Sequence, residues 1–196
     1  MPGDLRLTNR PVGRYAESIM DNTRSKILDH AMRMAIAAGD IPSLNELAHA
    51  AGISKGGLIH HFASRHSLLE AIARRGIESV DTAMEQARET RTVLRTWLQF
   101  SLPSSRDVAL FQALASVFFA SRSRTVDLDR IVADANERWE RMLAEELGSA
   151  PAARVARLLG DGMLMGSVTG AITTDSADTY LADSIEAVRA VVESLR

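Results

Sequence analysis

Cysteine is absent from the chain. This absence excludes a disulfide framework, a thiolate metal site and a cysteine nucleophile, and it fits a reducing compartment without proving one. Long apolar runs are missing as well, because none approaches the roughly 18 residues that a membrane helix needs. The first twenty residues also lack the apolar centre of a signal peptide. We therefore expect a cytoplasmic protein that does not associate with a membrane.

Excess positive charge is missing too, since the formal net charge of the 196 residues is -2. Nucleic-acid-binding proteins usually carry a basic surface, so this total argues against such a function. The total nevertheless combines two unlike parts. Residues 1–76 carry ten basic and seven acidic side chains with all five histidines, whereas residues 77–196 carry thirteen basic and eighteen acidic ones with most of the aromatics. This asymmetry favours a mildly basic nucleic-acid-binding part joined to a different module.

Apolar spacing is helical nearly throughout, and no stretch shows the sustained alternation of a β-strand. The sequence therefore predicts an all-α protein in which four N-terminal helices precede a helical bundle. Residues 1–20 contain two prolines and few apolar side chains, so we expect a flexible arm there, with contact to a DNA minor groove as an alternative role. The expected helices cover 27–38, 44–51, 55–62, 65 to about 90, 93–100, 108–120, 128–147, 152–174 and 179–195.

The most informative spacing lies between the second and third expected helices. A helix-turn-helix needs a small residue where its helices cross, a residue that tolerates positive φ at the turn, and a branched apolar residue that holds the second helix in the core. Ala48, Gly52 and Leu58 supply these in order, although an ordinary helical hairpin can show the same three residues. Ser43 and Glu46 have the spacing of a capping box at the start of the second helix. Ser54 and Ser64 are expected to cap the third and fourth helices.

The flanking sequence strengthens this interpretation. The runs TRSKILDHAMRMAIAAG and SLNELAHAAGISKGGLIHHFASRHSLLEAI resemble the DNA-binding domain of TetR-family transcriptional regulators over about residues 22–80. The resemblance implies that residues 21–80 form a three-helix helix-turn-helix domain. It further implies that the long fourth helix joins this domain to a helical ligand-binding and dimerisation domain, residues 81–196. Only the all-helical architecture of the second domain resembles the family.

The resemblance implies that the third helix enters the major groove of double-stranded operator DNA. Two positions depart from the family, because Gly57 and Ile59 stand where a threonine and a tyrosine are common. Gly56 and Gly57 offer no side chain for readout, so they indicate either close approach of the backbone to DNA or tight packing. Amides capped by Ser43 and Ser54 are further candidates for phosphate contact. The expected DNA-binding residues are Ser43, Ser54, Lys55, Gly56, Gly57, His60, His61 and Arg65.

Aromatic and methionine side chains in the second half are typical of an apolar cavity for a small molecule, and equally of a simple core. The candidates are Trp97, Phe100, Phe111, Phe118, Trp139 and Met163, with Gln112, Asn136 or Arg138 as polar anchors. By the resemblance, an unidentified effector bound there would weaken operator binding. We expect no cofactor and no metal.

Gly162, Gly166 and Gly170 recur every fourth residue and predict a smooth helical stripe that another helix approaches closely. Because the family dimerises through its last two long helices, we expect residues 152–174 and 179–195 to form a homodimer interface. Packing of the same stripe within one chain is the alternative.

The expected function is therefore ligand-responsive transcriptional regulation, with repression at a palindromic operator as the family's direction. An enzyme is not expected, because His60, His61 and His66 lack metal-ligand spacing and no serine, histidine and carboxylate set stands out. The alternative is a protein of the same fold that has lost operator binding and acts as a ligand-binding or interaction module. Gly57 and Ile59 are the residues that support this alternative.

Overall fold

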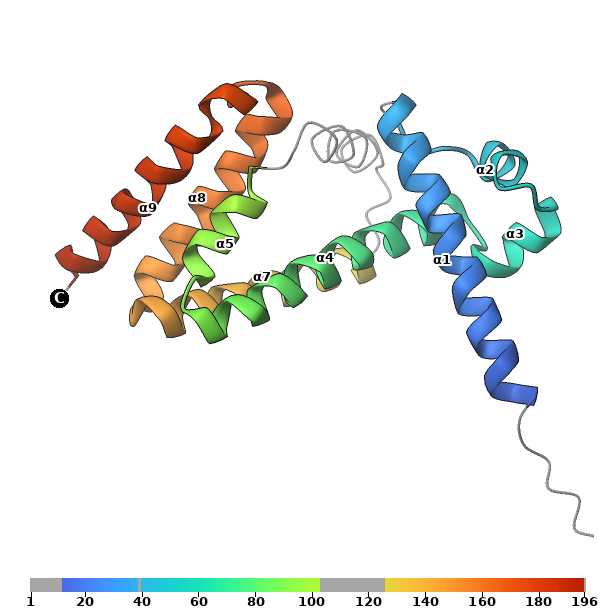
Figure 1. Cartoon of the computed structure of the whole chain (residues 1–196), viewed down its shortest axis with the longest axis horizontal. Helices are drawn as coiled ribbons and strands as arrows, with labels where there is room; N and C mark the ends of the chain where they lie inside the picture. The colour runs from blue at the N-terminus through green and yellow to red at the C-terminus, as the bar shows by residue number, and fades with distance from the viewer. Residues whose placement is uncertain (1–11, 39, 103–125, 196) are drawn as a thin grey trace, which may run out of the picture.

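The computed structural model describes residues 12–38, 40–102 and 126–195. Every regular element in these ranges is helical, which confirms the all-α prediction (Figure 1). A short 3-10 helix, η1 (Thr174–Ser176), precedes the last helix. The α-helices are α1 (Val12–Ala38), α2 (Leu44–Ala50), α3 (Lys55–His61), α4 (Arg65–Thr90), α5 (Val93–Phe100), α7 (Val126–Leu147), α8 (Ala150–Thr169) and α9 (Ala177–Ser194).

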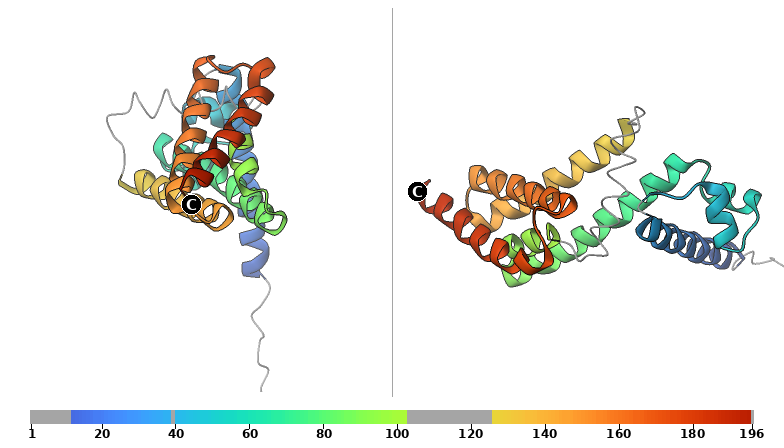
Figure 2. Two further views of the ribbon diagram at one scale, coloured as in Figure 1. Left: turned by 90° about the vertical axis from the view of Figure 1, so that its left-hand side faces the viewer. Right: turned by 90° about the horizontal axis from the view of Figure 1, so that it is seen from above.

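Helix α4 joins two hydrophobic cores at opposite ends of the molecule. Its first turns bury Leu68 and Ile72 against α1, α2 and α3, and its last turns bury Met84 and Ala87 against α5, α7, α8 and α9. Figures 1 and 2 show α2 and α3 at one end and the C-terminus of α9 at the other, with α4 running between the two lobes. A rotation of α4 would therefore be transmitted from one lobe to the other.

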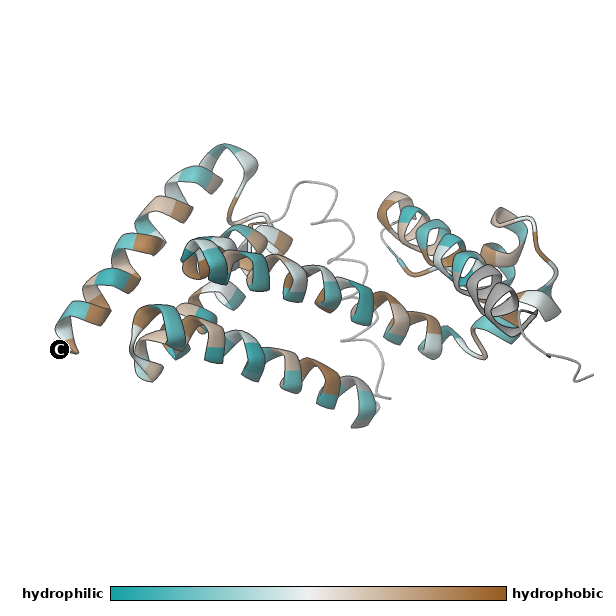
Figure 3. Cartoon of the chain, turned by 60° about the horizontal axis from the view of Figure 1, so that its bottom comes forward, coloured by the Kyte–Doolittle hydropathy of each residue, from teal (hydrophilic) through white to brown (hydrophobic). Residues whose placement is uncertain are grey.

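Apolar and polar residues are interspersed along the helices (Figure 3). This pattern is that of amphipathic helices, which bury one face and leave the other in water. Among the described residues, no helix combines the length and the apolar character needed to cross a membrane.

The structure corrects two expected boundaries. Helix α1 begins at Val12, so residues 12–20 are helical and not part of an arm, because the stretch that follows Pro11 contains no helix-breaking proline. Helix α8 ends at Thr169 and not at residue 174, because Gly170 adopts a left-handed φ of 78° and closes the helix. The expected helix at 108–120, with Phe111, Gln112 and Phe118, lies outside the described residues.

Candidate nucleic-acid interface

Helices α2 and α3 form a helix-turn-helix with the three residues in the expected roles. Ala48 and Leu58 are buried in the N-terminal core, and Gly52 has a φ of +66° in the turn. The amide of Ile53 donates to the carbonyl of Ala48 across the turn at 3.1 Å. Because Leu58 has no exposed surface, α3 is held against the core by one face and presents its other face to solvent.

Capping side chains fix the starts of both helices. The Ser43 hydroxyl accepts from the amide of Glu46 at 3.3 Å, while the Glu46 carboxylate accepts from the amide of Ser43 at 2.8 Å. These hydrogen bonds from Ser43 lower the pKa of Glu46 from its ordinary value of 4.5. The Ser54 hydroxyl accepts from the amide of Gly57 at 3.0 Å. Both expected serines are therefore structural caps, and this role leaves other amides at the helix starts facing outward.

The outward face of α3 combines polar and apolar groups. Lys55, Gly56 and His60 are exposed, and Ile59 leaves 43% of its surface in solvent. His61 is half buried, and its ring meets the ring of His60 edge to face with centroids 5.6 Å apart. The two histidines thus have different environments, since His60 projects outward while His61 lies closer to the domain.

Internal packing does not account for Gly56. A Cβ atom added there would meet nothing within 4 Å, and its φ is not positive. A Cβ added at Gly57 would come 3.3 Å from the Ser54 hydroxyl, which is a tight contact with the cap. Tight packing therefore explains Gly57, which lies against the side chain that caps the helix. It does not explain Gly56.

Arg65 is engaged within the domain. Its Nη2 donates to the Asp40 carboxylate at 2.9 Å and to the backbone carbonyl of Ile41 at 2.6 Å. These contacts tie the start of α4 to the loop between α1 and α2. The structure therefore gives Arg65 a positioning contact that its place in the sequence did not reveal.

Arg24 was missed by reasoning from the sequence. Its guanidinium lies 4.9 Å from the centroid of the Phe62 ring, at the end of α3, and Arg24 is otherwise exposed. Such a cation–π contact orients an arginine and leaves its donors free for another partner. The sequence carried no signal for this contact, because 38 positions separate the two residues.

A comparison with protein families agrees with this geometry. Residues 27–72 match the family model for bacterial regulatory proteins of the tetR family. The N-terminal lobe is therefore similar to the helix-turn-helix domain of that family. This confirms the resemblance seen in the sequence, and a comparison with curated proteins found no match.

Solved structures extend the likeness beyond the TetR-family domain. A Rhodococcus sp. protein assigned to the TetR family of transcriptional regulators is 22% identical, with a TM-score of 0.65, and the match covers 86% of this chain and 99% of that one. The superantigen PfiT is 22% identical, with a TM-score of 0.62 and coverage of 85% and 94%. A transcriptional regulator (TerR/AcrR family) from Aquifex aeolicus VF5 is 17% identical, with a TM-score of 0.60 and coverage of 89% and 99%. At these identities the likeness shows a shared fold, in which a TetR-type head precedes a helical C-terminal domain.

The expected effector residues of the C-terminal domain lie mainly in its core. The Trp97 indole donates to the carbonyl of Ala156 at 3.0 Å, and the Trp139 indole donates to the Asp81 carboxylate at 2.7 Å. Met163 is buried, whereas Phe100 is exposed. None of these four aromatic and methionine side chains lines the grooves at α5–α9, α4–α7 or α7–α8.

Arg138 and Asn136, the described candidates for polar anchors, lie in different contacts. Arg138 donates to Asp81 at 2.8 Å and so serves the contact between α7 and α4. Asn136 lines a separate groove between α7 and α8. Asn136 therefore does not share its groove with Trp97, Phe100, Trp139 or Met163.

Proposed function

We propose that the protein is a dimeric transcriptional regulator that binds operator DNA through α3. The observation that carries this proposal is the exposed face of α3 on a TetR-family helix-turn-helix, in which buried Leu58 and Phe62 point the opposite face outward. In the major groove, Lys55 and His60 would offer hydrogen-bond donors to base edges. The exposed Ile59 would contact a thymine methyl group. An isoleucine in place of the family tyrosine would therefore change the base contact at this position and not abolish it.

Phosphate contacts would fix the register of the domain on the duplex. His61 and the amides next to Ser43 and Ser54 are the proposed groups for this role. Arg65 would act mainly by holding the loop before α2, because its Nη2 already binds Asp40 and Ile41. Arg24, oriented by Phe62, adds a further cation at the end of α3.

The proposed dimer uses exposed faces of α8 and α9. Val155, Leu158, Gly162 and Met165 are all exposed on α8, with spacings of three or four residues that place them on one side of the helix. A Cβ added at Gly162 would meet nothing within 4 Å, so the glycine leaves room for a neighbouring helix from a second copy. Pairing of two such stripes would remove large apolar side chains from water.

The C-terminal domain would bind a small-molecule effector that shifts the relative positions of the two DNA-binding heads. Helix α4 supports this proposal, because its two ends belong to the two different cores. Release of a repressor from a palindromic operator is the direction that the family resemblance favours. The expression of a reporter gene placed downstream of the bound DNA would rise in a strain that lacks a repressor. It would fall in a strain that lacks an activator.

DNA binding is tested by fluorescence anisotropy with a duplex from upstream of the protein's own gene, against a scrambled duplex of equal length. We expect preference for the upstream duplex and affinity that falls steeply with salt concentration. Lys55→Ala should weaken binding, whereas Arg141→Ala, which removes an exposed positive charge from α7, should not. Absence of sequence preference at every salt concentration would refute the proposal and favour the interaction module.

A further inference from the structure

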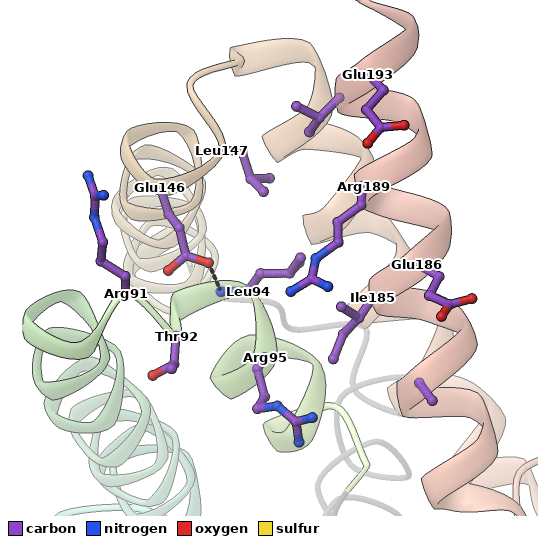
Figure 4. Close-up of a pocket in the computed structure, with 12 residues that line it drawn as sticks. Arg91, Thr92, Leu94, Arg95, Glu146, Leu147, Ile185, Glu186, Arg189 and Glu193 are labelled. Carbon is purple, nitrogen blue, oxygen red and sulfur yellow. Dashed lines mark hydrogen bonds between the residues drawn. The ribbon is translucent and has the colours of Figure 1, made fainter.

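A groove of about 530 Å³ lies between α5 and α9 (Figure 4), and none of the described aromatic candidates lines it. Its walls come from the α4–α5 turn, α5, the end of α7 and α9. This volume falls within the range of small-molecule sites, about 300–1,000 Å³. The lining combines apolar side chains with three arginines and three glutamates: Leu94, Leu147, Ile185 and Val192; Arg91, Arg95 and Arg189; and Glu146, Glu186 and Glu193.

The guanidinium groups of these three arginines bind no other side chain among the described residues. This contrasts with arginines nearby, since Arg88 binds both Glu85 and Glu145. Glu186 and Glu193 lie three and four residues from Arg189 on the same helix, at spacings that permit ion pairs. Arg189 forms neither pair, and Figure 4 shows it extending from α9 toward Leu94 instead.

Of the three glutamates around the groove, Glu146 is engaged by backbone amides and Glu186 is turned outward. Glu146 accepts hydrogen bonds from the amides of Val93 and Leu94, at 2.6 Å and 3.2 Å, and therefore caps α5. Glu186 projects to the outer side of α9 in Figure 4, away from α5. Arg189 thus reaches the apolar floor of the groove with its donors available.

The groove also stays clear of the proposed dimer contact. At about 100° per residue, Ile185 and Arg189 lie on one side of α9, and the small residues Ala187 and Ala190 lie on the other side. We assign the exposed Ala187 and Ala190 side of α9 to the proposed dimer contact, and a second copy packed there would leave the groove open. Its occupant must therefore be sought among ligands and not in the partner chain.

We propose that this groove binds an amphiphilic organic anion. A carboxylate would accept hydrogen bonds from Arg189 and Arg95, because a guanidinium binds a carboxylate with two parallel donors. The hydrocarbon part would lie on Leu94, Ile185 and Val192. The bound molecule would connect α5, next to the end of α4, with α9. This inference does not depend on DNA binding, and its test measures ligand binding alone.

Isothermal titration calorimetry of the full chain tests the proposal with three probes of equal chain length: octanoate, octan-1-ol and octyltrimethylammonium. We expect saturable binding of octanoate at one site per chain, weakened by salt, with much weaker binding of the alcohol and the cation. Arg189→Gln should weaken octanoate binding by about tenfold or more, which is the loss of one charge-assisted contact. Arg189→Lys should retain part of the affinity, because it keeps the charge and loses the fork of donors.

Arg33→Gln is the matched control, since Arg33 is exposed on α1 and lines none of the grooves described above. It should bind octanoate as the unchanged chain does. Circular dichroism should give the same helical spectrum for every variant, because Arg189 is exposed. Equal octanoate affinity in Arg189→Gln, equal binding of the cationic probe, or absence of saturable octanoate binding would each overturn the proposal.

Discussion

Gly56 occupies an exposed position in a helix of seven residues, where alanine would be the better helix former. The surroundings leave space for a methyl group, and the backbone there does not need positive φ. A glycine in such a place is costly for the free protein, and the proposed complex with DNA offers a use for it. Close approach of the α3 backbone to DNA is the use consistent with this geometry.

Gly56→Ala should therefore raise the free energy of unfolding by up to about 1 kcal/mol and weaken operator binding. The stability gain follows from better helix propensity, and the affinity loss follows from a methyl group between α3 and the duplex. Urea unfolding and fluorescence anisotropy measure the two effects separately.

Gly76→Ala is the control for this change. Gly76 is exposed in the middle of α4, and a Cβ there also meets nothing within 4 Å. It should gain similar stability without loss of DNA affinity. Tight operator binding by Gly56→Ala would show that the α3 backbone does not approach the duplex closely.

Ser54 allows the cap and the DNA contact to be separated. Ser54→Ala removes the acceptor for the Gly57 amide and should cost about 1 kcal/mol of stability. Ser54→Asp keeps an N-cap acceptor, so its thermal midpoint should stay near that of the unchanged chain. Its carboxylate would nevertheless repel phosphates, and operator affinity should fall. An aspartate variant with full DNA affinity would place Ser54 outside the interface.

Glu46 gives the capping box of α2 a pH dependence. Its pKa is lowered in the folded protein by the hydrogen bonds from Ser43. The carboxylate therefore contributes stability that is present above its ordinary value of 4.5 and is lost as the pH falls through the lower folded value. Glu46→Gln should be less stable than the unchanged chain at neutral pH. The difference in thermal midpoint should disappear in acid, and a difference that is constant with pH would contradict this origin.

At the scale of elements, two tryptophans connect four helices of the C-terminal domain. Trp139 of α7 donates to Asp81 of α4, and its ring lies 5.4 Å from that of Trp97, centroid to centroid. Trp97 of α5 in turn donates to Ala156 of α8. The close contact with α8 is possible because Gly160, one turn further on, has no side chain beside the Trp97 ring.

Gly160→Ala should consequently destabilise the protein. The added Cβ would clash with the Trp97 indole and lie 2.7 Å from the Ser101 hydroxyl, both in the core. Overpacking of this kind typically costs about 1–3 kcal/mol. Urea unfolding should show this loss, while Gly76→Ala, a glycine in open space, should show none. An unchanged midpoint in Gly160→Ala would mean that α5 and α8 separate easily.

At the scale of the whole molecule, the contact between the C-terminal domains would position the two heads of the proposed dimer. Leu158 leaves 54% of its surface exposed in the centre of the α8 stripe. Leu158→Glu should convert the proposed dimer to a monomer, because a carboxylate would be buried in the contact without a partner. Sedimentation equilibrium measures the mass, and circular dichroism should show an unchanged helical spectrum.

Operator affinity should fall in Leu158→Glu, since one monomer reaches only one half-site. Arg141→Ala is the control, because Arg141 is exposed on α7, outside the α8 stripe. It should remain dimeric. A dimer that persists in Leu158→Glu would assign self-association to another surface.

Local interactions made a large part of the TetR-type head predictable. The caps at Ser43, Ser54 and Ser64 and the turn at Gly52 depend on residues within about four positions of one another, so the sequence shows them directly. The buried places of Ala48 and Leu58 follow from helical periodicity.

Contacts between distant residues were decided only by the tertiary structure. The periodic stripe at Gly162 suggested close helix packing, but the glycine pressed against a neighbouring helix is Gly160, because Trp97 packs there from α5. The sequence predicted a DNA contact for Arg65, but only the structure shows its bond to Asp40, 25 positions away. The groove lined by Arg95 and Arg189 is formed by residues from separate helices, so no spacing in the sequence predicts it. The sequence determines the short-range hydrogen bonds, because their donors and acceptors lie within a few residues of one another. The tertiary structure decides the pockets and the distant side-chain partners, because these depend on which helix faces pack together.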